Sequence, residues 1–416
     1  MDATAASRPA APTAPPHPGV GFPEFVALVA GLMALNALSV DVMLPGLAAI
    51  DAALGVADDN DRQLVLGVYL GGFAAAQLVW GPLADRFGRK PALLVGLGLY
   101  VLASVAAALA PSFGALLAAR LAQGLTAAST RVIALALVRD CYAGRGMGRV
   151  MSLVMMVFMI VPILAPGIGQ VILLVAPWRW MFGLLLAGGV AMLLWVVLRL
   201  PETLRPRHRR RLRLAPLLAA YGEIVTNRVT CGYMLALGVI FGALFGFLTS
   251  AQQVMQEVFG LGLWFTVAFA GIAGLMSAAS FTNARLVERL GMRRLGHGAL
   301  VGFTLLSVVQ FALAAAGFEV FAVFFVLQAG TLFLFGFIGA NFNALAMEPV
   351  GHIAGTAAAL VGFTQTFLGA VLGSLVGQAY DGTTLPLAAG YALLGLATLA
   401  IVTLTERGRL MRAQAR

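Results

Sequence analysis

The chain has 416 residues, of which 61% are hydrophobic and only 11% are charged, and its formal net charge is +10. Soluble domains are about 45–50% apolar, so an ordinary soluble protein is excluded; a soluble protein with an unusually apolar core would need polar faces that these segments lack. Almost all basic residues lie in short connectors between apolar runs, which is typical of membrane loops and excludes a nucleic-acid-binding protein.

The first twenty residues, MDATAASRPAAPTAPPHPGV, are rich in proline and alanine. They lack the basic start, the apolar stretch and the cleavage site of a signal peptide. We therefore expect residues 1–22 to form a disordered cytoplasmic tail. The two cysteines, Cys141 and Cys231, form neither a disulfide framework nor a metal-ligand cluster, so we expect no structural disulfide and no metal site.

Apolar runs of about 20 residues, long enough to span a bilayer as helices, follow one another along the chain. We expect twelve membrane helices, over residues 24–47, 63–83, 91–110, 113–138, 149–176, 178–200, 229–251, 262–284, 296–317, 319–345, 354–379 and 386–405. The longest polar connector, 201–228, separates two groups of six, at 23–200 and 229–405, and residues 406–416 form a C-terminal tail. The sequence thus predicts an all-α membrane protein of two six-helix halves joined by a cytoplasmic linker.

The distribution of cations among the connectors indicates the orientation of the chain. With a cytoplasmic N-terminus, the cytoplasmic connectors and C-terminal tail hold most of them: Arg86, Arg89, Lys90, Arg139, Arg145, Arg149, the cluster at 205–213, Arg285, Arg289, Arg293, Arg294, Arg407, Arg409, Arg412 and Arg416. The opposite side holds few, chiefly Arg62 and Arg179. Because cytoplasmic loops are enriched in arginine and lysine, we expect both termini to be cytoplasmic.

The two halves also repeat. LADRFG (83–88) aligns with LVERLG (286–291) at an offset of 203 residues, with the order acid, arginine, apolar residue, glycine preserved. Lys90 then aligns with Arg293, and both copies fall at the cytoplasmic end of the second helix of their half. A parallel repeat of six helices is typical of one large class of transporters, which hold substrate near the bilayer midplane between the halves.

Several stretches carry a resemblance to a known family. GPLADRFGRK (81–90) matches a signature of the loop between helices 2 and 3, RLAQG (120–124) matches the helix 4 signature R-x-x-Q-G, and DVMLPGL (41–47) and PETL (201–204) fit the same group. The chain resembles the major facilitator superfamily and, within it, the twelve-helix drug:proton antiporters of the Bcr/CflA type. The resemblance covers residues from about 25 to 405 and implies the major facilitator fold, with two pseudo-symmetric halves.

The resemblance also implies motif residues. These are Gly81, Asp85, Arg86, Gly88, Arg89 and Lys90 in the loop 2–3 motif; Arg120, Gln123 and Gly124 in the helix 4 motif; and Pro162, Pro166 and Gly169 in the helix 5 motif. The helix 5 signature of antiporters is G-P-x-x-G-G. Here it reads APGIGQ (165–170), with Ala165 and Gln170 in place of glycines. This departure weakens the inference of antiport.

The charges of the loop 2–3 motif serve two expected purposes. Its arginines and lysine fix topology at the inner leaflet, and glycines at 81 and 88 let helix 2 and the loop approach their neighbours closely. The resemblance implies that Asp85 meets the start of helix 11, near Gly355, and holds the cytoplasmic side shut in the outward-open state. The alternative is that the whole motif determines topology only.

Two charges fall inside predicted membrane helices. At about 1.5 Å per residue, Asp41 in helix 1 and Arg120 in helix 4 both lie roughly 9–10 Å below the outer interface, a matched depth that suits a charge pair. Charges at such positions are functional by default, so we expect Asp41 to carry the proton and Arg120 to modulate it electrostatically. Alternatively, Asp41 caps the kink at Pro45 or extends outward.

Other polar residues of the predicted helices are weaker candidates. Arg131 lies eleven residues after Arg120, on nearly the same helix face, and either lines an inner cavity or extends to the interface. Asn36, Asn341 and Gln365 either line the cavity or bond to neighbouring helices, which is the commoner outcome. No Walker A sequence, metal-ligand cluster or nucleophile with a matching base is present, so we expect no enzyme activity and no cofactor other than a proton gradient.

The sequence therefore predicts a proton-coupled exporter of small hydrophobic or cationic drugs, in a bacterial inner membrane, that works by alternating access. Its expected partners are the small-molecule drug or metabolite, protons and the lipid bilayer, with no nucleic acid, and the chain is expected to be a monomer. One alternative is a dedicated metabolite transporter of the same fold. Another is a membrane sensor, which would need a signalling domain that the short cytoplasmic segments cannot form.

Overall fold

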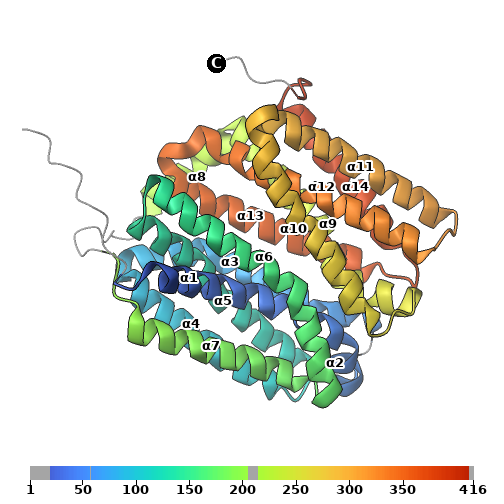
Figure 1. Cartoon of the computed structure of the whole chain (residues 1–416), viewed down its shortest axis with the longest axis horizontal. Coiled ribbons are helices and arrows are strands. Elements are labelled where there is room, and N and C mark those ends of the chain that lie inside the picture. Colours follow the sequence, from blue (N-terminus) through green and yellow to red (C-terminus); the bar gives the residue numbers. More distant parts are fainter. Residues whose placement is uncertain (1–18, 57, 205–213, 412–416) are drawn as a thin grey trace, which may run out of the picture.

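The computed structural model describes residues 19–56, 58–204 and 214–411, and this part of the chain is helical apart from short connections (Figure 1). The first half contains α1 (Phe22–Asp41), α2 (Leu47–Leu54), α3 (Leu64–Phe87), α4 (Arg89–Ala108), α5 (Phe113–Cys141), α6 (Gly144–Val175) and α7 (Arg179–Arg199). After α8 (Leu214–Thr226), the second half contains α9 (Arg228–Gln252), α10 (Trp264–Leu290), α11 (Met292–Ala315), α12 (Phe321–Met347), α13 (Ala354–Gln378) and α14 (Leu385–Thr405).

The predicted membrane helices are all present in the described residues. By length and hydropathy there are eleven candidate membrane-spanning stretches, and one of them, Phe321–Gln378, comprises both α12 and α13. The predicted twelve-helix fold is therefore confirmed, and the chain is a multi-pass membrane protein. The tail at 1–18, the arginine run at 205–213 and the end of the chain at 412–416 lie outside the described residues. The linker region contributes one helix that was not predicted, α8.

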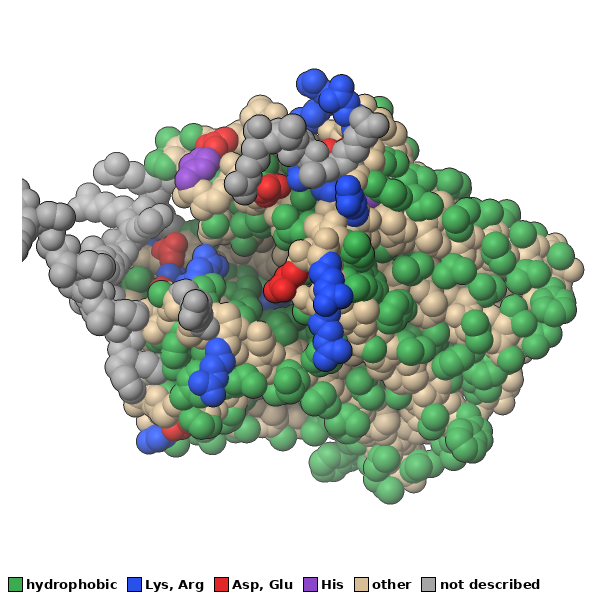
Figure 2. Space-filling view, turned by 45° about the horizontal axis from the view of Figure 1, so that its top comes forward, with side chains coloured by type: hydrophobic (Ala, Val, Ile, Leu, Met, Phe, Trp, Pro, Cys, Tyr) green, Lys and Arg blue, Asp and Glu red, His purple; other side chains and the backbone are tan. Residues whose placement is uncertain are grey.

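The surface is divided by polarity. Figure 2 shows hydrophobic side chains covering the flank of the molecule, whereas arginine, lysine and carboxylate side chains gather at one end, where the surface is hollowed between them. Leu102, Val175 and Leu404 are among the large apolar side chains that stay exposed. Such extensive apolar exposure marks a surface made to contact something other than water, here the lipid of the bilayer.

The first membrane helix ends earlier than predicted. α1 stops at Asp41 instead of residue 47, and a 3₁₀ turn, η1 (Leu44–Gly46), leads into the short helix α2. Pro45 is the physical reason, because a proline ring clashes with the carbonyl group four residues earlier, here that of Asp41. Asp41 is therefore the last residue of α1 and not an interior one.

Two glycines end corresponding helices in the two halves. α3 stops before Gly88 (φ 110°) and α10 before Gly291 (φ 79°), and α4 and α11 begin directly afterwards. Only glycine adopts such angles readily, so each sharp reversal needs the glycine of its repeat. Each connection consists of a single glycine, because the charged ends of α3 and α10 remain helical beyond residues 83 and 284, where the sequence predicted these helices to end.

The two halves lie side by side, with the first in blue to green and the second in yellow to red (Figure 1). In the first half α3 packs against α5, and in the second α9 packs against α13. The halves meet where α3 lies against α13 and where α6 lies against α10.

Candidate functional site

Arg120 of α5 is completely buried, and three acceptors hold its guanidinium. Nε donates to the carbonyl oxygen of Val65 in α3 (3.0 Å), Nη2 to that of Ser39 in α1 (3.0 Å), and Nη1 to Oε1 of Gln123 (2.6 Å). The guanidinium also lies 4.4 Å from the ring centroid of Tyr69, within the range of a cation–π contact. Two predicted motif residues, Arg120 and Gln123, therefore join α1, α3 and α5.

A chain of hydrogen bonds continues from Gln123 through α4 and back to α1. Gln123 Nε2 donates to Ser104 Oγ (2.8 Å), and Ser104 Oγ donates to the carbonyl oxygen of Tyr100 (2.8 Å). The Tyr100 hydroxyl donates to Ser39 Oγ (2.7 Å), which itself donates to the carbonyl oxygen of Leu35 (2.7 Å). Sequence reasoning missed Tyr100 and Ser104; their only signal was that they are polar groups in an otherwise apolar helix.

Asp41 lies next to this cluster but outside it. Its side chain is buried, with 4% of the residue exposed, and it has no hydrogen-bond or ion-pair partner among the described residues. The predicted pair between Asp41 and Arg120 is therefore wrong for this structure. The reason lies in the end of α1: the Met43 amide bonds to Val40 (3.3 Å), which leaves the carbonyl of Ser39 for the guanidinium.

The two alternatives for Asp41 also fail. Within the described part of the chain its carboxylate accepts no hydrogen bond from the backbone near Pro45, so it does not cap the kink. Because it is buried, it does not extend to the outer surface either. Asp41 is a buried acid that forms no hydrogen bond or ion pair with the described residues, and its role in carrying protons stays a prediction.

Gly124 brings the backbones of α3 and α5 together. A Cβ at this position would collide with the carbonyl group of Tyr69 and lie 3.0 Å from the amide nitrogen of Phe73. Gly72 makes the reciprocal approach from α3, where a Cβ would lie 2.6 Å from the carbonyl oxygen of Leu121. This close contact of two backbones lets Arg120 reach a carbonyl group of α3.

The helix 5 motif packs against the break after α1. Pro162 and Pro166 lie inside α6, and Gly169 faces η1 so closely that a Cβ would collide with the carbonyl group of Val42 and lie 2.9 Å from Pro45 Cγ. A glycine is needed at 169 because of this approach. The motif therefore supports the segment that follows Asp41.

Arg89 organises a charged cluster at the end of the first half that carries the cation-rich connectors, which is the inner end in the expected topology. Its guanidinium bonds to Asp85 of α3 and, through Nε, to Asp140 of α5 (2.9 Å). Glu202, from the PETL stretch, accepts hydrogen bonds from the backbone amides of Arg89 (3.0 Å) and Lys90 (3.3 Å). These amides are the unpaired start of α4, where a carboxylate is favoured. The motif thus fastens three helix ends and the segment after α7 together.

The contact predicted between Asp85 and the start of α13 is absent from the described residues. Asp85 pairs with Arg89 of its own half, and Nη1 of Arg139 lies 3.5 Å from the place of a Cβ at Gly355. The contact was expected for a state that is open to the outside. Because Asp85 has its ion-pair partner within the first half here, its gating role stays a prediction.

The other loop 2–3 motif residues point elsewhere. Arg86 lies over the ring of the following phenylalanine, 5.2 Å from its centroid, and Lys90 Nζ donates to the carbonyl oxygen of Val197 (2.9 Å). A Cβ at Gly81 would make an ordinary contact with Val132 at 3.8 Å. The expected close approach at Gly81 is therefore wrong; the close approaches of α3 lie nearer its outer end.

The second half has a corresponding inner cluster. Arg293 bonds to Glu406 through Nε (3.0 Å) and lies 3.5 Å from Glu348 through Nη1. The Tyr233 hydroxyl donates to Glu406 (2.6 Å) and lies 2.8 Å from Nε2 of His297. Arg293, aligned with Lys90 in the sequence repeat, thus takes the bridging position that Arg89 has in the first half.

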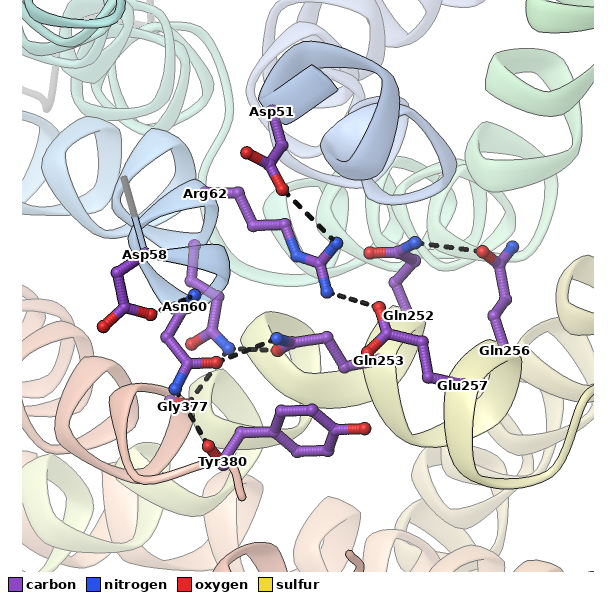
Figure 3. A network of polar contacts seen from close by, with 11 residues as sticks. Asp51, Asp58, Asn60, Arg62, Gln252, Gln253, Gln256, Glu257, Gly377 and Tyr380 are labelled. Atoms are coloured by element: carbon purple, nitrogen blue, oxygen red, sulfur yellow. Dashed lines mark hydrogen bonds and ion pairs between the residues drawn. The ribbon is translucent and has the colours of Figure 1, made fainter. Parts of the chain in front are cut away.

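At the opposite end, which is the outer end in the expected topology, polar side chains join the two halves. Figure 3 shows Arg62, in the 3₁₀ turn η2 (Asp59–Gln63), between Asp51 of α2 and Glu257 of the π-helical turn η4 (Gln253–Val258). Arg62 forms an ion pair with Glu257 and lies 3.9 Å from Asp51. Of the ion pairs in the described ranges, Arg62–Glu257 alone connects the first half with the second.

Amide side chains complete this contact between η2, η4 and the end of α13. Gln63 Nε2 donates to the side chain of Gln253 and to the carbonyl oxygen of Gly377 (3.0 Å), and Gln253 Nε2 donates to Asn60 Oδ1 (3.0 Å). Asn60 Nδ2 donates to the carbonyl oxygen of Gln378 (3.1 Å). These bonds close the outer side.

The contact between α3 and α13 weakens toward the inner end. Gln77 Nε2 donates to Thr366 Oγ1 (3.1 Å). Over the described residues, α3 forms no further hydrogen bond with α13 on the inner side of Gln77. Among the described residues the halves are therefore joined firmly at the end with Arg62 and less firmly beyond Gln77. In the expected topology this corresponds to a closed outer side.

The four predicted cavity residues divide into two groups. Asn36 accepts a hydrogen bond from a tyrosine hydroxyl of α3 (2.8 Å), and Asn341 donates to Asn283 of α10 (2.6 Å). Gln365 and Arg131 are half-buried and have no hydrogen bond or ion pair with any described residue. Asn36 and Asn341 thus bond neighbouring helices, whereas the cavity-lining role of Gln365 and Arg131 stays a prediction.

A twelve-helix membrane bundle of two halves, with buried charged side chains among its helices, defines a multi-pass membrane transporter. The chain matches the family model of the Major Facilitator Superfamily over residues 29–374. A bicyclomycin resistance protein homolog of Haemophilus influenzae is 31% identical over 370 residues, 87% of this chain and 91% of the relative. The multidrug resistance protein MdtL of Klebsiella pneumoniae is 29% identical over 396 residues, 91% of this chain and 96% of the relative.

Solved structures agree on the fold. The xylose transporter XylE from E. coli, in a partially occluded inward-open conformation, has a TM-score of 0.72 at 11% identity and covers 94% of this chain and 99% of its own. The chain belongs to the major facilitator superfamily. The resemblance seen in the sequence is thus confirmed, and the prediction that the chain is no enzyme follows from its family of transporters.

Proposed function

We propose that the protein exports small hydrophobic or cationic compounds, such as drugs, from a bacterial cell in exchange for protons. The names of the two relatives, which refer to bicyclomycin and multidrug resistance, support this substrate class. The two halves, at 23–200 and 229–405, would rock against each other as a monomer in the inner membrane. The cation-rich connectors support a topology with both termini inside.

The observation that carries the proposal is the isolation of Asp41. A carboxylate in a membrane helix is costly, and such residues mark proton or substrate pathways. Asp41 is buried, lies at the broken end of α1 and has no partner among the residues that the structure describes. An acid whose surroundings alternate between dry and wet can load and release a proton. Arg120, fixed by its three acceptors, supplies a constant positive charge to the same helix cluster.

The proposal is tested by measuring proton release from purified protein in weakly buffered detergent when a compound is added. The panel comprises lipophilic cations, chloramphenicol-like drugs and nucleobases. The wild type is compared with Asp41→Asn and with Asp381→Asn, a control that neutralises an exposed acid after α13. We expect release from the wild type and the control but not from Asp41→Asn.

Two other results would count against the proposal. Release that persists in Asp41→Asn removes this residue from the role of proton carrier. No release with any drug, together with release by a nucleobase, replaces a drug exporter with a dedicated metabolite transporter of the same fold.

A further inference from the structure

The outer contact between the halves contains two chemically different parts. The amide part, formed by Asn60, Gln63 and Gln253 with backbone carbonyls of α13, carries no charge and does not titrate. The charged part is the ion pair of Arg62 and Glu257. Among the side chains that join the halves, a change in pH therefore acts on the charged part. The carboxylate of Asp58 accepts a hydrogen bond from the backbone amide of Asn60 (2.9 Å), but this bond lies within the first half.

The two ends of the ion pair differ in their access to water. The Arg62 side chain is 5% exposed, whereas the Glu257 side chain is 42% exposed. Arg62 also leaves its buried Nε without an acceptor, so its charge is balanced by carboxylates alone. Of the two carboxylates near it, Asp51 belongs to the same half, and Glu257 belongs to the other. Only Glu257 both holds the halves together and meets the outer solution.

The other titratable groups around Glu257 do not compete for this role. Tyr380 follows α13 and lies near Glu257. Burial and the charge of Glu257 raise the pKa of Tyr380 to about 12, so its hydroxyl stays neutral. Asp381 is exposed and accepts hydrogen bonds from Thr383. Neither group forms an ion pair across the halves within the described ranges.

The local backbone supports a movable contact. Glu257 lies in η4, a six-residue π-helical turn at the end of α9. Turns of this kind are rare and occur frequently at functional sites. The neighbouring Gln252 and Gln63 each leave a buried side-chain oxygen without a hydrogen bond. Buried polar atoms without partners are costly, so the closed contact is not fully satisfied.

We propose that Glu257 is a second proton-accepting site, at the outer mouth, and that its neutralisation by a proton from outside releases the outer contact between the halves. The ionised carboxylate holds Arg62 and keeps the outer side closed. Once protonated, Glu257 no longer attracts the guanidinium, which keeps Asp51 within its own half. Its use in transport rests on the proposed exchange of drug for protons: external protons would open the side through which the drug leaves.

The test measures the distance between the outer ends of the two halves by spin-label spectroscopy. Labels are placed on cysteines at Ala53 in α2 and Leu263 before α10, both exposed, in a chain with Cys141 and Cys231 replaced by alanine. A second labelled pair, Ala53 and Leu109, lies within the first half and reports any general loss of structure. Distances are recorded from neutral to acidic pH without substrate.

We expect the short distance to dominate at neutral pH and a longer one to grow as the pH falls. Loss of one such pair changes an equilibrium by about fivefold, so Glu257→Gln should lower the closed-to-open ratio about fivefold at neutral pH and remove most of its pH dependence. Arg62→Gln should give the same result, and the double variant no more. Asp51→Asn, which removes a carboxylate on the same side as Arg62, should behave as the wild type.

A distance distribution in Glu257→Gln that equals the wild type at every pH would overturn the proposal. So would an equal opening in Asp51→Asn, which would show that any loss of charge near Arg62 is sufficient. Because no substrate or proton gradient is present, the result is independent of the exporter hypothesis. If the drug assay showed no proton release, the conclusion from the distance measurement would not change.

Discussion

Replacing Arg120 by methionine removes three hydrogen bonds from the cluster of α1, α3 and α5. Side-chain hydrogen bonds in membrane proteins contribute about 0.6 kcal/mol on average and up to about 1.7 kcal/mol. Three of them therefore stabilise the fold by about 2–5 kcal/mol. Removing the buried charge also restores part of this free energy, because the charge no longer has to be desolvated. We expect Arg120→Met to lower the free energy of unfolding by about 2 kcal/mol.

Thermal unfolding in detergent measures this loss, with a thiol-reactive dye that reports exposure of the buried Cys141. A loss of this size lowers the midpoint by a few degrees. Arg131→Met is the matched control, because Arg131 lies in the same helix and has no partner among the described residues. Equal midpoints for the two variants would refute the reasoning, since the three bonds would then contribute nothing.

Two further predictions concern helix contacts. Gly124→Leu places a side chain against the backbone of α3 and should abolish folding or strongly reduce the yield of folded protein. Gly98→Leu in α4 is the control, because a Cβ at Gly98 would meet nothing within 4 Å and the yield should therefore not fall. Size-exclusion chromatography measures both yields, and equal yields would contradict the prediction. Glu202→Gln removes a negative charge at the start of α4 and should lower the free energy of unfolding by about 0.3–1 kcal/mol at low salt and by less at high salt. Thermal unfolding at the two salt concentrations measures this loss. A loss that does not depend on salt would contradict the electrostatic explanation and indicate a packing effect.

Much of the fold was predictable because the bilayer imposes a simple rule. Apolar runs of fixed length separate charged connectors, so α5 begins at Phe113 and α13 at Ala354, as expected. The repeat around Gly88 and Gly291 was visible because both positions need the same rare backbone angle. Arg120 was found as a charge inside a predicted membrane helix, whereas its partner Gln123 was found only through the family resemblance.

The partners of the charges were not predictable. Depth along a helix gives no direction for a side chain, so the matched depths of Asp41 and Arg120 did not make them a pair. Arg62 and Glu257 are separated by 195 positions, and no local pattern indicates that they meet. The amide contacts of the outer side share this property, because each joins residues from different halves.

The two inner clusters have a consequence for how such a chain is assembled. Arg89 finds its carboxylates in the first half and Arg293 in the second, and in the part of the chain that the structure describes neither takes a charged partner across the divide. Each half therefore neutralises its own inner charges, and the first half has all of these partners once residues up to Asp140 have been synthesised. The same independence is what an ancestral six-helix protein would have needed before two copies were fused into one gene.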